Sequence, residues 1–168
     1  MKNAKTIQLA KQEKAATLFM ENGIQWVRLR GAEIPLAGVP ELTEDQFVAL
    51  ADVKDKSKMI VTLGHGVPER MRDTVDGEEL ADPIGVKILY QGTALIPIRS
   101  KSGVCFIDAK YLLPYSDIEN GVQLYVRKEG GGKRMIAVKT GFLYVGSIAE
   151  YFPGELIEKL TAVVGAAG

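Results

Sequence analysis

Six short segments rich in Val, Ile, Tyr and Phe follow one another from residue 84 onward, separated by turns or short linkers. β-Branched and aromatic residues favour extended backbone, and a break such as Gln91-Gly92 is typical of a hairpin. The sequence therefore predicts a mainly antiparallel sheet in this part of the chain. Its predicted strands are 84–90, 93–98, 103–107, 121–127, 134–139 and 142–148.

The chain before residue 84 is predicted to be richer in helix. Residues 5–22 contain many strong helix formers and end at Asn22-Gly23, which predicts a helix with a glycine cap. Thr43 and Gln46 have the spacing of a capping box, which predicts a second helix from residue 43 to about 53. Two short strands are predicted beside these helices, at 24–30 and 59–63.

Two further helices are predicted within and after the sheet. Asp108 is placed to cap a short helix over 108–113, and Pro114 limits its extension. A C-terminal helix begins near Pro153 and carries apolar residues at helical spacing as far as Gly165, which is expected to stop it.

Together these elements predict an α+β fold: N-terminal helices, then a mainly antiparallel β-sheet with a short helix and a C-terminal helix. The length of 168 residues and a hydrophobic fraction of 46% suit a single domain over residues 1–168. Segment 31–42 or segment 76–83 could separate an α-rich unit from the sheet, and the second would give units 1–80 and 84–168. Residues 31–42 hold two prolines and two glycines and are predicted to form a loop.

Charge and cysteine content limit the partners and the cellular compartment that the sequence predicts. Twenty-one basic and twenty-one acidic side chains cancel, so the broad positive field of a dedicated nucleic-acid binder is not expected. Cys105 is the only cysteine, which suits a reducing compartment. The N-terminal residues lack the apolar core of a signal peptide, and no stretch has the length of a membrane span. We expect a cytoplasmic protein that does not bind membranes.

Few residues suggest catalysis or metal binding. His65 lies between two glycines and could act as a general acid or base, alone or paired with Cys105, but a solvated turn is the preferred interpretation. Cys105 follows strand alternation, which favours a packed thiol. One His and one Cys cannot build the common type of zinc site, and the acidic residues lack EF-hand spacing. A carboxylate-only Mg²⁺ or Ca²⁺ site stays open, but a solvated acidic face is the preferred interpretation, and we expect neither a metal nor a cofactor.

Two charged segments of opposite sign are the candidate binding sites. The acidic segment, 69–82, could bind a basic partner or imitate phosphate; the basic segment, 127–139, could contact nucleic acid or an acidic partner. The three consecutive glycines of the basic segment do not have the spacing of a phosphate-binding loop. The acidic candidates are Asp73, Asp76, Glu78 and Glu79, and the basic candidates are Arg127, Lys128, Lys133, Arg134 and Lys139. Both sets are predicted to lie on exposed turns.

Residues 103–153 carry a family resemblance. Ala109-Lys110-Tyr111-Leu112-Leu113 follows a predicted strand, three strands come next, and Tyr151-Phe152-Pro153 closes the segment. This order and these motifs resemble one subdomain of a bacterial DNA sliding clamp. The resemblance implies a clamp-like α+β unit with relatives in phage or mobile-element DNA metabolism. One such unit cannot make a ring, and residues before 84 do not supply a second.

Two functional classes follow from these observations. The leading hypothesis is a non-enzymatic binding protein, an inhibitor or adaptor such as a phage-type anti-defence protein, which acts on a protein partner through the acidic segment. The alternative is an accessory protein in DNA transactions, with the basic segment on nucleic acid. A small enzyme ranks third, because no nucleophile, base and orienting residue are recognisable together. The oligomeric state is left open.

Overall fold

The computed structural model describes residues 2–119 and 121–166. The first part of the chain contains α1 (Asn3–Glu13), β1 (Ala15–Glu21), β2 (Ile24–Arg28), β3 (Ala32–Pro35), α2 (Glu44–Leu50), η1 (Lys56–Lys58) and β4 (Ile60–Leu63). The second part contains β5 (Glu79–Pro83), β6 (Ile88–Tyr90), β7 (Thr93–Ser100), β8 (Gly103–Asp108), η2 (Ala109–Tyr115), β9 (Gln123–Lys128), η3 (Gly130–Gly132), β10 (Arg134–Thr140), β11 (Leu143–Ala149), η4 (Gly154–Leu156) and α3 (Ile157–Ala166).

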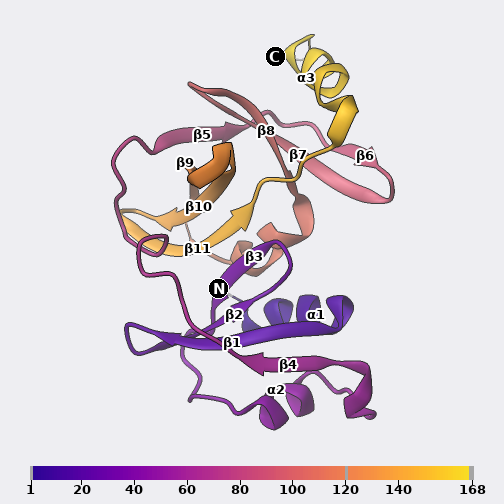
Figure 1. Cartoon of the computed structure of the whole chain (residues 1–168), viewed down its shortest axis with the longest axis vertical. Helices are drawn as coiled ribbons and strands as arrows, with labels where there is room; N and C mark the ends of the chain where they lie inside the picture. The colour runs from indigo at the N-terminus through magenta and orange to yellow at the C-terminus, as the bar shows by residue number, and fades with distance from the viewer. Residues whose placement is uncertain (1, 120, 167–168) are drawn as a thin grey trace.

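One mostly antiparallel sheet runs through the described residues. Its strand order is β4-β1-β2-β3-β11-β10-β9-β5-β7-β6, and β8 pairs with the other edge of β7. The β1–β4 pair is parallel. The N-terminal strands join the C-terminal ones through β3 and β11, which pair only at Ser147 with Glu33 and at Ile148 with Ala32. Figure 1 shows β3 at this joint, between the two parts of the fold.

The prediction of a helix over residues 5–22 is wrong in its second half. The helix α1 ends at Glu13, and Lys14 forms a left-handed cap with a φ of 57°. Residues 15–21 are strand β1, which pairs antiparallel with β2. Asn22 and Gly23 both have positive φ, at 50° and 74°, and turn the chain between these strands. The Asn-Gly pair therefore marks a hairpin turn and not a helix cap.

Other boundaries also differ from the predictions. The predicted loop 31–42 contains β3, and the predicted strand 84–90 is strand only at Ile88–Tyr90, while β5 precedes it. The N-terminal part therefore contains more strand than predicted, because β1 and β3 join the strands expected at 24–30 and 59–63. The capping box of Thr43 and Gln46 is confirmed, as are strands close to the other predicted positions. The short helix after Asp108 is a 3-10 helix that includes Pro114, and α3 continues through Gly165.

The main hydrophobic core lies on one face of the sheet. Leu18, Val27 and Ile34 stand in register across β1, β2 and β3, and all three are fully buried. Ile136 and Ile148 continue this core on β10 and β11. Side chains from α1, α2 and η2, including Leu9, Phe47 and Tyr111, pack against it. Burial of this apolar surface is the main source of stability that the fold offers.

Part of the opposite face of the sheet, where β1, β2 and β11 carry aromatic side chains, is covered by chain without helix or strand. Phe19, Trp26 and Tyr144 stack there, and Met71 packs against them. Met71 belongs to residues 64–78, which we call the covering segment and which join β4 to β5. Among the described residues, no helix has both the length and the apolar character needed to cross a membrane.

Candidate functional site

A buried cluster of charged groups fixes the covering segment to the sheet. Arg127 on β9 is only 3% exposed, and its Nε donates to Glu78 Oε2 at 2.9 Å. Its Nη1 donates to the carbonyl oxygen of Arg70, and its Nη2 to that of Arg72, each at 2.8 Å. The planar guanidinium suits this pattern because its donors point in fixed, divergent directions. Arg127 is therefore a structural anchor for the covering segment.

Glu78 accepts a second cation in the same cluster. Buried Lys139 on β10 forms an ion pair with Glu78, and its Nζ lies 4.2 Å from the centre of the Tyr125 ring. Burial alone would raise the pKa of Glu78, but hydrogen bonds from Lys139 and Arg127 outweigh it and hold that pKa below its ordinary value. Glu78 is thus ionised at neutral pH and satisfied by two cations.

The expectation that the candidates lie on exposed turns is wrong for Arg127 and Lys139, which are buried on strands, and for Glu78, whose side chain is only 9% exposed. Arg127 and Lys139 from the basic segment both bind Glu78 from the acidic segment, so that opposite charges compensate for burial. The opposite signs of the segments were the sequence signal for this pairing. The pairing itself can be recognised only when β9 and β10 lie beside residue 78.

The remaining candidate residues differ in their partners and exposure. Asp73 Oδ1 accepts the Tyr144 backbone N–H at 2.8 Å, and Glu79 accepts the Ser102 N–H at 2.7 Å. Arg134 lies on β10 with 19% of its side chain exposed, and it donates to Glu150 and to the Val104 carbonyl oxygen, so the expected exposed turn is wrong for Arg134 as well. Asp76, Lys128 and Lys133 are exposed, and the Lys128 Nζ lies 4.0 Å from Glu79. Lys128 and Lys133 are therefore the basic candidates best placed to meet a partner.

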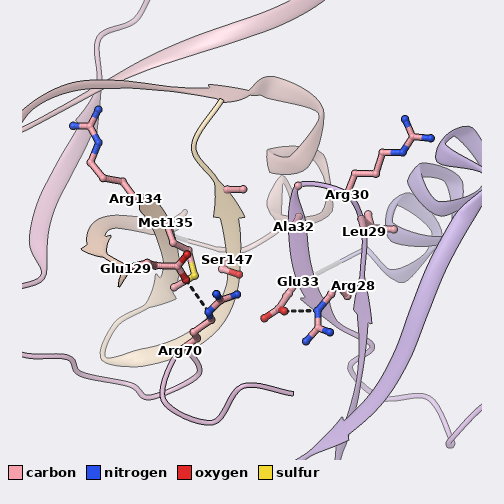
Figure 2. A pocket seen from close by; sticks show the side chains of 12 residues that line it. Arg28, Leu29, Arg30, Ala32, Glu33, Arg70, Glu129, Arg134, Met135 and Ser147 are labelled. Carbon is pink, nitrogen blue, oxygen red and sulfur yellow. Dashed lines mark hydrogen bonds and ion pairs between the residues drawn. The ribbon is translucent and has the colours of Figure 1, made fainter. Parts of the chain in front are cut away.

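A cleft of about 150 Å³ opens beside the β3–β11 joint. Two ion pairs face each other across it: Arg28 with Glu33 on one side, and Arg70 with Glu129 on the other (Figure 2). The Arg28 Nε to Glu33 Oε1 distance is 2.6 Å, and the Arg70 Nε to Glu129 Oε1 distance is 2.8 Å. Sequence reasoning missed this cleft because its walls come from four separated segments and form no motif.

Exposed apolar side chains gather around β4, which is the terminal strand of the sheet order and pairs along one edge with β1. Ile60 and Leu63 on β4 are 67% and 66% exposed. The helix α2 lies beside β4 (Figure 1), and its Leu50 is 55% exposed. An end strand with exposed apolar side chains is a common place for another chain to bind.

His65 and Cys105 occupy different environments. Cys105 is fully buried in the main core, whereas His65 lies on the exposed start of the covering segment and its carbonyl oxygen accepts from Arg28. Burial raises the pKa of the Cys105 thiol to about 11. Within residues 2–119 and 121–166, no three His, Cys, Asp or Glu side chains are grouped to hold a metal ion.

We expect the Cys105 thiol of the native protein to react with an aromatic disulfide reagent at least about a hundredfold more slowly than an unfolded control, since the thiolate is the reactive form and burial suppresses it. The measurement is the rate of thiol release at pH 8, with and without 6 M guanidinium chloride. Equal rates in the two conditions would show that the thiol is accessible and contradict the buried position.

No family model, no curated protein and no solved structure matches the chain. The resemblance of residues 103–153 to a sliding-clamp subdomain accordingly stays a prediction.

Proposed function

We propose that the protein is a non-enzymatic adaptor or inhibitor that binds a protein partner along β4. The observation that carries this proposal is the pair of exposed apolar side chains, Ile60 and Leu63, on a terminal strand. Burial of two such side chains in an interface contributes about 1.5–3 kcal/mol each. The proposal keeps the binding role expected from the sequence but moves it from the acidic segment to β4.

The backbone of β4 supports binding of an extended partner. The N–H groups of Ile60 and Gly64 donate to Lys14 and Leu18, on the side of β1. Alternate residues of a strand direct their N–H groups to opposite edges, so those of Val61 and Leu63 point away from β1. A partner strand could accept from these groups while its side chains contact Ile60 and Leu63.

The acidic segment is a weaker candidate than the sequence suggested. Glu78 is used inside the protein by Arg127 and Lys139, while Asp73 and Glu79 accept backbone N–H groups. An acidic surface that imitates phosphate needs carboxylates free to meet cations. Three of its four candidates already have partners in the fold.

A role in DNA transactions is the second candidate. Lys128 and Lys133 are exposed at the two ends of the β9–β10 turn, where their side chains could contact phosphates. Two such contacts give a salt dependence with a slope of about −2 on logarithmic axes. Binding of a labelled oligonucleotide that falls with Lys128→Gln and Lys133→Gln, and with that salt slope, would favour this role over the first.

Extended peptides that bind the wild-type protein can be selected from a displayed random library. We expect these peptides to bind the Val61→Pro and Leu63→Lys variants roughly tenfold more weakly, or worse. Proline removes an N–H that points away from β1, and lysine replaces an exposed apolar contact. The measurement is fluorescence polarisation with the selected peptides.

The matched control is Leu89→Lys, which changes a side chain that is 78% exposed on β6. Circular dichroism checks that all three variants remain folded. Selected peptides that bind Val61→Pro and Leu63→Lys as tightly as the wild type would show that β4 is not the docking strand.

A further inference from the structure

The cleft beside the β3–β11 joint contains a carboxylate oxygen without a donor. The Glu33 side chain is 8% exposed, and its Oε1 is engaged by Arg28. Its Oε2 has no hydrogen-bond partner among the described residues. A buried charged oxygen without a donor costs roughly 1–3 kcal/mol or more, so an added donor in this cleft would recover stability.

The facing wall supplies donors of the opposite charge. Arg70 belongs to the covering segment, its side chain is 45% exposed, and its Nε contacts Glu129. Figure 2 shows the outer nitrogens of Arg70 directed toward Ser147 and the space before Glu33, while Arg30 and Arg134 point away from it. Arg70 is a long side chain at the mouth, so a rotamer change can admit a group to the carboxylate of Glu33.

The charges of the cleft select the kind of ligand. The charge of Arg28 offsets that of Glu33, and the charge of Arg70 offsets that of Glu129. A ligand of large net charge would therefore leave excess charge in a partly dehydrated site. A ligand that carries one positive and one negative group matches both walls. The small volume of the cleft limits it to a few heavy atoms beyond those two groups.

We propose that this cleft binds a small zwitterion of the α-amino-acid class. The ligand ammonium donates to Glu33 Oε2, and the ligand carboxylate accepts from the outer nitrogens of Arg70, in the charge-assisted geometry that guanidinium favours. The Ser147 hydroxyl lies between the two walls and adds a polar contact to the floor. Glu33 lies on β3, which β1 and β2 separate from β4 in the sheet order, and this proposal does not depend on the proposed protein binding.

The test is isothermal titration of the wild-type protein with each of the twenty L-amino acids, up to 10 mM. We expect at least one to bind in the micromolar-to-millimolar range. Its N-acetyl derivative and its carboxamide, each lacking one of the two charges, should bind roughly tenfold more weakly or worse. Acetate alone should not bind measurably at the same concentrations.

Variants assign the two contacts. Arg70→Gln should weaken the amino acid that binds best by roughly tenfold or more, and Arg70→Lys should recover part of the loss. Arg72→Gln, two residues away on an exposed side chain of the same segment, is the matched control and should change nothing. Glu33→Gln should weaken the ammonium contact, with thermal unfolding used to confirm that the variant is folded.

Three results would overturn the proposal. The first is that no amino acid binds the wild type at 10 mM. The second is that acetate or the N-acetyl derivative binds as well as the free amino acid, since the carboxylate of Glu33 would then have no role. The third is that Arg70→Gln, folded, binds as the wild type does.

Discussion

Replacement of Arg127 by Met is expected to lower the free energy of unfolding by about 3–5 kcal/mol. The substitution keeps the volume of the aliphatic stem but leaves Glu78 with one cation fewer in a site where its side chain is 9% exposed. It also removes the donors for the carbonyl oxygens of Arg70 and Arg72. Urea unfolding followed by circular dichroism measures the change.

The neighbouring Lys128→Met is the matched control, because Lys128 is 68% exposed and lies 4.0 Å from Glu79. It should change the free energy of unfolding by about 0.5 kcal/mol or less. A loss of under 1 kcal/mol in Arg127→Met would mean that the covering segment is held by other contacts.

The same cluster predicts acid sensitivity. The folded-state pKa of Glu78 lies below its unfolded value of 4.5, so its contribution to stability is present above pH 4.5 and is lost as pH falls through the folded pKa. Glu78→Gln should therefore lose stability at neutral pH and show a shallower further loss on acidification than the wild type.

The second large effect is expected at Gly146, where alanine should cost about 3 kcal/mol. An added Cβ would overlap with the hydroxyl oxygen of Tyr115 and lie 2.9 Å from the Glu33 carbonyl oxygen. The φ of Gly146 is +151°, a conformation that other residues rarely adopt. Both effects act at the strand that joins the two parts of the sheet, and thermal unfolding measures their sum.

Tyr115 separates the clash from the backbone strain. Its hydroxyl is buried and has no hydrogen-bond partner among the described residues, so Tyr115→Phe alone should cost little or stabilise the protein. The double variant with Gly146→Ala should regain part of the lost stability. Gly141→Ala, with a φ of +59° and open space around its Cβ, should cost only about 1 kcal/mol. Equal costs at the two glycines would contradict the clash.

Local signals in the sequence predicted local structure well. The side chains of Thr43 and Gln46 satisfy each other's backbone donors within one turn, so the capping box could be recognised without the rest of the fold. The β10–β11 hairpin likewise joins neighbouring segments through Gly141, whose positive φ suits the turn. Such elements depend on residues a few positions apart.

The errors arise where distant segments decide the outcome. Residues 15–21 have good helix propensity, but as β1 they bury Leu18 against Val27 and Phe19 beside Trp26, and tertiary packing outweighs that propensity. Arg127 and Glu78 are 49 residues apart, and the cleft joins residues as distant as Arg28 and Glu129. The charged groups of the cleft come together only when β3 pairs with β11.

The narrow joint between β3 and β11 also determines the order in which the strands can pair during synthesis. Strands β1 to β4 lie within the first 63 residues and can pair as soon as that stretch has left the ribosome. The partner of β3, however, is residues 143–149, so one edge of β3 stays unpaired until those residues have emerged. During that interval, the nascent protein presents an open strand with the apolar Ile34 beside it, the kind of edge that chaperones shield from aggregation.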